Sequence, residues 1–424
     1  MSSWDHRYRI ALVLALTAWA VVCAFVPHLP VNPASRYAAI EALVEHGTWA
    51  IDDTSLLRST VDKVYWGEHF YSSKPPLLPL LLTPFYAVWR LWTGTGFADD
   101  AYAAAAWMRL FSGILPWLLG CAAVSALLDR FARHTATRVV GFTAWAAGSL
   151  ATAYAAHLDN HSWAVAAILL GALALAPLVD DDPDGARPIL GGAAFGLAFA
   201  FDLGAGPTVG LLGAVFVVLS IRAGRIGDAV AFTLAALAPV LAQALIQWQI
   251  AGTPKPFYLL GEAYDYPGSY WNRMVEFDAL TEPKLVYAFH ALFGHHGLFS
   301  VTPWLLAGAL GLCVVPEGAA RRAVHAAAVA AVLFTVIYYV ARTTNYGGRC
   351  VGMRWYMVIH PTLWVGLVLG LDRRPSWRTP VGLAAIAALV AMGVVSALHG
   401  MMNPWEEGLV HGFYRAFGMG SVDG

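Results

Sequence analysis

Long apolar runs separated by short polar segments dominate this chain. Runs of about 17 to 25 apolar residues match an α-helix that crosses a hydrocarbon layer roughly 30 Å thick. Such runs cover residues 10–26, 139–156, 164–179, 229–246, 323–340, 356–371 and 381–398, and two further runs cover 75–92 and 104–128. The pattern predicts an all-α polytopic membrane protein, for which we expect about 11 to 13 transmembrane helices.

The composition supports this class. Hydrophobic residues make up 58% of the 424 residues and charged residues only 12%, whereas ordinary soluble domains carry about 25% charged residues. A net charge of −1 indicates no basic surface, so we expect no nucleic-acid partner. Three of the four cysteines fall inside apolar runs and only Cys350 lies in a polar segment. The sequence therefore supports neither a disulfide framework nor a zinc knuckle.

Basic residues in the connections indicate how the chain lies in the membrane. Arg7 and Arg9 precede the first apolar run, and the positive-inside rule places that end in the cytoplasm, with the run retained as an anchor. Further basic connections lie at 221–225, 317–322 and 371–378. We expect a multi-pass protein of the bacterial cytoplasmic (inner) membrane, in which residues 1–424 form one domain. Its large extracytoplasmic loops are expected at 28–74 and 252–295.

One basic connection conflicts with this topology. Residues 127–138 are rich in arginine and should be cytoplasmic. If the runs at 75–92 and 104–128 both crossed the membrane, this connection would lie outside. Either one of the two apolar runs does not cross fully, or the connection breaks the positive-inside rule.

The first predicted loop combines an amphipathic helix with a polar, aromatic segment. One helical face of residues 33–49 is apolar and Gly47 ends the pattern, so we expect a short helix on the membrane surface. The apolar face consists of Tyr37, Ile40, Leu43 and Val44. One interpretation is an interfacial helix that only plugs the bundle. The segment that follows favours binding, because it gathers carboxylates, cations and rings. They are Asp52, Asp53 and Asp62; Arg36, Lys63 and Lys74; and Tyr65, Trp66, Phe70 and Tyr71.

Two stretches of this loop resemble a known family. "SRYAAIEALVEHGTWAID", followed by "GEHFYSSKPPLLPLLLTPFY", resembles the GT-C glycosyltransferases, in particular the branch of the protein O-mannosyltransferases and the lipid A aminoarabinose transferase. Looser counterparts are "LDNHSWAVAAILLGALAL", "GGAAFGLAFAFDLGAGP" and "GGRCVGMRWYMVIHP". The resemblance implies a membrane enzyme whose donor is a polyprenyl-phosphate sugar.

The resemblance also implies a role for the cations of the loop. In the family, the lysine of the Lys-Pro motif and the Arg-Tyr pair lie at the donor phosphate. The matching residues here are Lys74, Arg36 and Tyr37, with Tyr71 nearby. A lysine acts as a point charge toward a phosphate, which suits a donor whose headgroup lies at the membrane surface.

The chain departs from the family pattern at two places. Pro33 and Ala34 replace the Asp-Glu pair whose aspartate is the family's general base. The base is therefore expected elsewhere, and the candidates are Asp62, Asp52 and Asp53. Asp202 stands where the family often has a basic residue. The expected substitutes are Arg349 and Arg354, because arginines at a membrane edge favour anion contact.

Two polar clusters are candidates for sugar or acceptor contact. Asn160 and His161 lie in the turn at 157–163, where a turn with satisfied polar groups and a His-x-x-x-His metal site are the alternatives. Tyr264 and Asp265 lie in an aromatic and acidic stretch, which an interfacial aromatic belt also explains. The histidines of 289–299 favour interfacial packing, with metal binding as the alternative.

The sequence therefore favours an inverting glycosyltransferase with a polyprenyl-phosphate sugar donor and an envelope lipid, glycan or protein as acceptor. We expect its active site to face outward, and the reaction to need no metal or other cofactor, since cationic side chains can neutralise the leaving phosphate. A transporter or flippase for a lipid-linked glycan is one alternative. A catalytically inactive relative that binds polyprenyl phosphate is another, because the Asp-Glu pair is absent.

Overall fold

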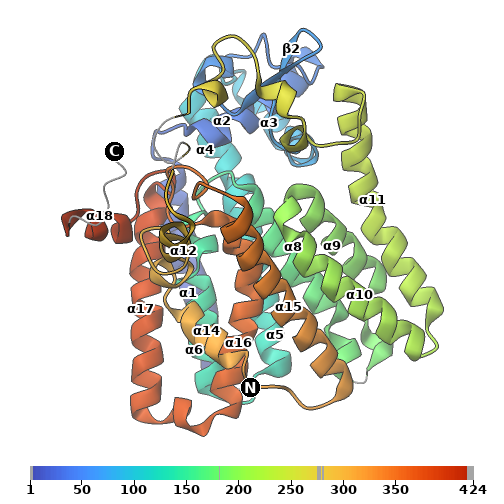
Figure 1. The fold of residues 1–424 in the computed structure, drawn as a ribbon, viewed down its shortest axis with the longest axis vertical. Coiled ribbons are helices and arrows are strands. Elements are labelled where there is room, and N and C mark those ends of the chain that lie inside the picture. Colours follow the sequence, from blue (N-terminus) through green and yellow to red (C-terminus); the bar gives the residue numbers. More distant parts are fainter. Residues whose placement is uncertain (1–2, 181, 275–277, 279–280, 418–424) are drawn as a thin grey trace.

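The apolar runs form the long helices of a bundle in the computed structural model of the chain (Figure 1). The structure describes residues 3–180, 182–274, 278 and 281–417, so part of the predicted 252–295 loop lies outside the described residues. Within these ranges, seven helical stretches are long and apolar enough to cross a membrane, by length and composition. They are α1 (Ser3–Ala24), α4 (Ala101–Arg109) continued through η3 (Leu110–Ile114) into α5 (Leu115–Phe131), α8 (Asn160–Leu175) with η4 (Ala176–Asp180), η6 (Leu203–Ala205) with α10 (Gly206–Arg222), α11 (Ile226–Ala251), α15 (Ala319–Arg342) and α17 (Pro380–Met402).

Shorter helices pack between the long ones. They are α6 (Thr135–Ala146), α7 (Leu150–Ala153), α9 (Pro188–Phe201), α14 (Trp304–Gly311) and α16 (His360–Arg373). α9 packs against α8 and α11, and α14 packs against α16. The predicted all-α membrane class is confirmed, whereas the number of crossings stays a prediction. The other short elements are α12 (Lys284–Leu292), α13 (Leu298–Val301), α18 (Leu409–Ala416), η2 (Leu57–Ser59), η5 (Pro183–Gly185), η11 (Arg354–Ile359) and η12 (Pro375–Arg378).

Glycines allow the short helices to approach their neighbours closely. A Cβ atom added at Gly196 of α9 would overlap the backbone carbonyl of Ala236 in α11. A Cβ atom at Gly308 of α14 would likewise overlap the carbonyl of Leu363 in α16. Small residues at such contacts increase van der Waals packing, which stabilises helix pairs where lipid removes the hydrophobic driving force.

The apolar run at 75–92 forms α3 (Leu77–Thr93), which does not cross the bundle. The residue that leads into α3, Lys74, pairs with Asp62. Near the other end of α3, Arg90 lies 3.6 Å from Glu45. α3 also packs against α2 (Val31–Glu41) and η1 (Ala42–His46) of the 28–74 segment, and Figure 1 shows α3 beside α2 at the upper end of the molecule.

This placement of α3 resolves the conflict over the basic connection at 127–138. Asp180 bonds with Arg130 of that connection and with Arg321 of the 317–322 connection, at 2.6 and 2.7 Å. The basic connections thus lie together, at the end of the bundle where Figure 1 places the N-terminus. Of the two alternatives, the structure supports an apolar run that does not cross.

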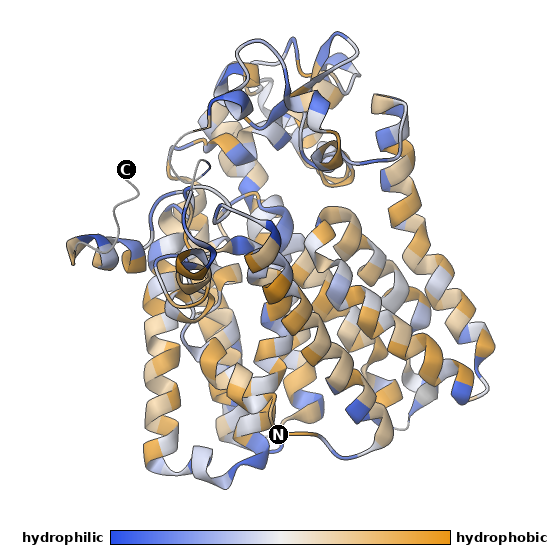
Figure 2. Cartoon of the chain, in the orientation of Figure 1, coloured by the Kyte–Doolittle hydropathy of each residue, from blue (hydrophilic) through white to orange (hydrophobic). Residues whose placement is uncertain are grey.

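A small polar cap covers the other end of the bundle, and we define it as residues 31–74 and 252–272. It contains α2 (Val31–Glu41), η1 (Ala42–His46), strands β1 (Lys63–Trp66) and β2 (His69–Ser72), and the turns η7 (Phe257–Leu259), η8 (Gly261–Tyr264) and η9 (Tyr270–Asn272). The strands form an antiparallel hairpin. Gly67 and Glu68 adopt positive φ angles of 55° and 72° in its two-residue turn, as the twist of a tight hairpin requires. Figure 2 shows hydrophilic residues concentrated in the cap and hydrophobic residues along the bundle.

The first helix of the cap differs from the expected surface helix. Residues Asn32 to Glu41 of α2 are all buried within the protein. The apolar residues Tyr37 and Ile40 pack into the main core, while the polar side chain of Glu41 accepts a hydrogen bond from the Ser55 amide at 3.0 Å. The expectation of a helix lying on the membrane surface is therefore wrong, because the polar face of α2 is buried against other parts of the protein.

Candidate active site

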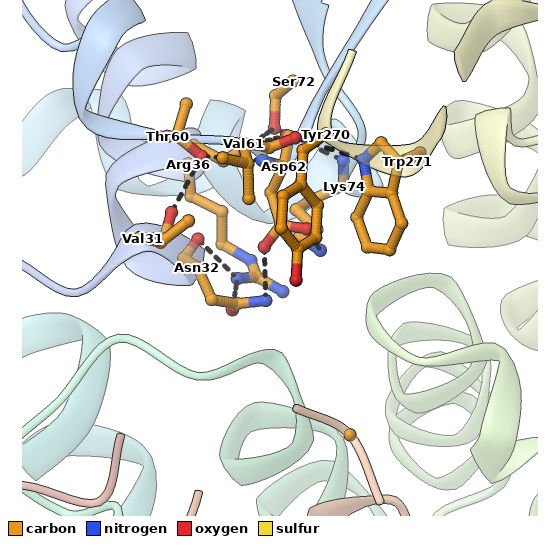
Figure 3. A network of polar contacts seen from close by, with 12 residues as sticks. Val31, Asn32, Arg36, Thr60, Val61, Asp62, Ser72, Lys74, Tyr270 and Trp271 are labelled. Atoms are coloured by element: carbon orange, nitrogen blue, oxygen red, sulfur yellow. Dashed lines mark hydrogen bonds and ion pairs between the residues drawn. The ribbon is translucent and has the colours of Figure 1, made fainter. Parts of the chain in front are cut away.

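An ion pair between Asp62 and Lys74 lies in the cap (Figure 3). The Asp62 Oδ1 atom lies 2.9 Å from Lys74 Nζ, and the two side chains are only 9% and 10% exposed. Asp62 directly precedes β1 and Lys74 follows β2, so the hairpin register, in which Lys63 faces Ser72, brings the two together. The amide of Ser73 also donates to the Asp62 carbonyl at 3.1 Å. The hairpin thus explains how an acid and a base twelve positions apart meet at the start of α3.

A second cation joins this pair through asparagine side chains. Arg36 of α2 donates to Asn32 Oδ1 at 2.7 Å and to Asn160 Oδ1 at 2.5 Å. The side-chain amide of Asn32 (Nδ2) in turn donates a hydrogen bond to Asp62 Oδ2 at 2.8 Å. Arg36 is only 2% exposed. We call Asn32, Arg36, Asp62 and Lys74 the polar cluster, in which α2 and the hairpin meet the N-terminus of α8.

Three cationic side chains, Lys74, Arg36 and Arg354, interact electrostatically at the polar cluster. Burial, together with the nearby charges of Arg36 and Arg354, lowers the pKa of Lys74 to about 8, and the Asp62 carboxylate opposes this shift. Lys74 is therefore mainly protonated at neutral pH but close to losing its proton. A second carboxylate, Asp159, interacts electrostatically with Arg36 and Arg354. Three crowded cations in a largely dry site favour the binding of an anion.

Arg354 and Arg349, which were both expected at the phosphate, lie in different surroundings. Arg354 is buried, donates to the Gly347 carbonyl at 3.0 Å and packs over the Trp405 ring at 4.5 Å. Its Nε atom has no hydrogen-bond partner among the described residues. Arg349 is half exposed and pairs with Glu407 at 3.3 Å. The structure therefore associates Arg354, and not Arg349, with the charges of the polar cluster.

The two expected tyrosines contact rings rather than the ion pair. Tyr37 is fully buried and packs on Phe97, with 5.3 Å between ring centroids. Tyr71 is half-buried and stacks on Phe257 at 6.1 Å. Tyr71 and Lys74 line a crevice of about 10 Å³, which is space for one water molecule. The crevice as it stands is therefore too small for a sugar phosphate.

The other two candidate bases lie away from the cations. Asp52 accepts hydrogen bonds from the Phe70 amide at 3.2 Å and lies 3.2 Å from His69 Nδ1, so it braces the hairpin. Asp53 is exposed and has no ion pair among the described residues. Of the three candidates, only Asp62 contacts Lys74.

The first residues of α8 are Asn160, as described, and His161. His161 Nδ1 lies 2.5 Å from Asp202 Oδ2. Asp202, which replaces a basic residue of the family pattern, therefore has a buried partner in this chain. The alternative of a metal site at His157 and His161 has no support from this arrangement, because His157 contacts the Met401 carbonyl at 3.0 Å.

Of the two candidates in the second loop, one lies near the polar cluster and the other lies on the exposed surface. Tyr264 is half-buried and meets the Trp271 ring edge-on at 5.7 Å, and Trp271 donates to the Val61 carbonyl beside Asp62 at 3.1 Å. Asp265 accepts from Asn272 at 2.9 Å on the exposed side of the loop. Tyr264 thus belongs to the cover of the polar cluster, and Asp265 to its outer surface.

Sequence reasoning missed three residues that the structure brings to this region. Asn32 links Arg36 to Asp62, Tyr258 places its ring 6.0 Å from Lys74 Nζ, and Asp159 is fully buried. Asp159 caps α8 by accepting from the Ser162 amide, and its other oxygen has no hydrogen-bond partner among the described residues. In the sequence, the acidic residue of the polar stretch "LDNHSW" was the signal that could have pointed to Asp159.

Comparisons with known proteins identify the fold. No protein-family profile matches the sequence, and no curated protein sequence is significantly similar to it. Solved structures that share its architecture include ArnT from Cupriavidus metallidurans in the apo state, with a TM-score of 0.51 and 14% identity over 91% of this chain and 64% of ArnT. Another is the Archaeoglobus fulgidus oligosaccharyltransferase in a complex with zinc and sulfate, with a TM-score of 0.51 and 16% identity over 96% of this chain and 54% of that protein.

Both relatives are GT-C fold membrane glycosyltransferases, so the predicted resemblance is confirmed at the level of the fold. The chain spans less than two thirds of the length of either structure, 64% of one and 54% of the other. It therefore shares the GT-C fold over part of the length of these structures.

Proposed function

We propose that this GT-C chain is an inverting glycosyltransferase that moves a sugar from a polyprenyl-phosphate donor to an envelope lipid, glycan or protein. The observation that carries the proposal is the buried Asp62–Lys74 pair at 2.9 Å, with Arg36 and Arg354 close enough to shift the Lys74 pKa. This arrangement offers positive charge for a phosphate and a carboxylate for a proton in one place. Its position at the start of α3 suits a headgroup at the membrane surface.

The chemistry follows from exchange of partners at Lys74. The donor phosphate replaces Asp62 as the partner of Lys74, and Arg36 and Arg354 add charge that stabilises the leaving group. The acceptor hydroxyl attacks the anomeric carbon while the bond from that carbon to the phosphate oxygen breaks, and the electron pair leaves on polyprenyl phosphate. Asp62, still held by Asn32, accepts the hydroxyl proton as general base. A single displacement inverts the anomeric centre.

The position of charge along the helices supports an enzyme over a transporter. Arg109 of α4 donates to the carbonyl oxygens of Ala24 and Val26 at the end of α1. Arg9, near the other end of α1, pairs with Asp5 and Asp129. The buried charges of Arg109 and Arg9 therefore bind partners near the ends of a membrane-spanning helix. A transport site would instead place polar groups near the bilayer midplane.

A turnover assay tests the proposed function. Purified protein is incubated with a bacterial lipid extract and a panel of polyprenyl-phosphate pentoses and hexoses, and released polyprenyl phosphate is measured by chromatography. We expect release from at least one donor that depends on the acceptor extract. Binding of donors without any release would instead support the inactive binding protein, and neither binding nor release would contradict both.

Orientation is part of the proposal, since a lipid-linked donor is used on the outer face. In a cysteine-free background, a cysteine at Ser55, an exposed position of the cap, should react with a membrane-impermeant thiol reagent in spheroplasts. The matched control is a cysteine at Glu317, whose side chain is 84% exposed at the opposite end, and which should react only after lysis. The reverse pattern would place the polar cluster in the cytoplasm.

Donor binding should depend on pH through Lys74. With a pKa of about 8 in the free protein, Lys74 is charged below pH 8, and affinity for the anionic donor should be constant there. Above pH 8 Lys74 is mostly neutral and must take up a proton when the donor binds. The donor affinity should therefore fall by up to about tenfold per pH unit. Lys74→Arg keeps its charge and should remove this dependence, as measured by donor titration from pH 6 to 10. An unchanged fall in that variant would assign the titration to another group.

A further inference from the structure

Three buried histidines converge at a place separate from the polar cluster. His295 and His296 lie in the turn between α12 and α13, and His411 lies on α18 far along the chain. One ring nitrogen from each of the three lies within 4.8 Å of those of the other two. The three residues are 3%, 1% and 2% exposed. The fold has therefore brought together three ligand-bearing side chains in a water-poor place.

Further groups complete the site. The His290 ring stacks on His295 with 4.1 Å between centroids, and the Tyr346 ring stacks on His296 at 5.0 Å. Glu407 Oε2 lies 3.7 Å from His411 Nε2, and Glu407 also pairs with Arg349 and Arg415. The rings fix the orientation of the ligands, and a water molecule would supply the fourth position of a tetrahedron.

The spacing fits a small divalent ion after minor rotation of side chains. With metal–nitrogen bonds of about 2.0–2.1 Å, two imidazole nitrogens on one tetrahedral zinc lie roughly 3.3–3.4 Å apart. The observed contact between His295 Nδ1 and His296 Nδ1 is 2.5 Å, and the largest separation in the group is within 4.8 Å. The required spacing lies between 2.5 Å and this upper bound, so the ion would widen the first contact.

We propose that His295, His296 and His411 form a site for a divalent transition metal ion, with zinc as the expected occupant because imidazole ligands suit it. The ion would fasten α18 to the turn between α12 and α13. Because the Met353 amide donates to the His296 carbonyl at 2.9 Å, it would also brace the segment that carries Arg354. The role is structural, and it does not depend on the proposed glycosyl transfer.

Metal analysis of the full chain tests this proposal without an activity assay. Tag-free protein is stripped with chelator, incubated with zinc chloride, desalted and analysed by inductively coupled plasma mass spectrometry, and its affinity is measured against a fluorescent zinc chelator. We expect about one zinc ion per chain in the native protein. His411→Ala should lower the affinity more than about 100-fold, because loss of a ligand exceeds the 10–100-fold cost of losing a supporting residue.

A second histidine variant controls for effects unrelated to the proposed site. His325→Ala, in α15 and outside the group, should bind zinc as the native protein does. If His411→Ala misfolds, His411→Gln keeps a polar side chain of similar size and serves in its place. Zinc should also protect α18 from limited proteolysis in the native protein but not in the His411 variant. No zinc retained by the native protein, or equal retention in both variants, would overturn the proposal.

Discussion

Replacing Lys74 with alanine is expected to weaken donor binding by about 10- to 150-fold and to reduce turnover at least as much. A hydrogen bond to a charged group contributes roughly 1.5–3 kcal/mol, which corresponds to that range. Lys74 is the cation that contacts Asp62 directly, and it would contact the phosphate that takes the place of Asp62. The measurement is a donor titration, followed by single-turnover rates at saturating donor.

This variant needs a control for folding. Removing Lys74 leaves Asp62 buried without its ion-pair partner, and breaking a buried pair from one side costs about 3–5 kcal/mol. The double variant Lys74→Ala with Asp62→Asn removes both charges and should recover most of the stability but not the donor affinity. Lys74→Arg keeps the charge and should bind donor within about tenfold of the native protein. Native donor affinity in a folded Lys74→Ala protein would show that the phosphate binds elsewhere.

Asp62→Asn is expected to separate binding from chemistry. Loss of a general base typically reduces turnover by roughly 10²–10⁴-fold. Donor affinity should be retained or increased, because the carboxylate that competes with the phosphate for Lys74 is gone. Asp62 raises the Lys74 pKa, so in this variant Lys74 loses its proton at lower pH. Binding should therefore be compared at pH 6, where Lys74 is still charged.

Two neighbouring acids provide matched controls for Asp62→Asn. Asp53 is exposed and Asp52 braces the hairpin, so their asparagine variants should turn over donor within a few-fold of the native protein. Full turnover by Asp62→Asn would remove Asp62 from the mechanism, and the acid to examine next would be Asp159, whose second carboxylate oxygen has no hydrogen-bond partner among the described residues.

The sequence predicted the parts of the molecule whose signal is local. Long apolar runs predicted the helices, and the motif around Arg36 and Lys74 predicted both the GT-C fold and two members of the polar cluster. The surface helix was wrong because amphipathicity does not distinguish lipid from a buried polar partner, and Arg36 finds such a partner in Asn160. The run at 75–92 looked like a span because hydropathy does not record that α3 packs against α2 and η1 of the cap.

The remaining site residues depend on long-range contacts. Asn32 joins the polar cluster only because the hairpin carries Asp62 back to α2. Tyr258 comes from an irregular loop without a periodic pattern, so nothing in its neighbourhood pointed to Lys74. His411 meets His295 and His296 through the packing of α18. Spacing along the chain gave no sign of that group, whereas the pair His295 and His296 was visible by itself.

Electron cryomicroscopy of the Asp62→Asn protein with a non-hydrolysed polyprenyl-phosphate sugar tests the central claim most directly. The account predicts phosphate density within hydrogen-bond distance of Lys74 Nζ, near Arg36 and Arg354, with the sugar facing residue 62. Phosphate density at another place on the protein, with Lys74 still buried under the cap, would contradict it.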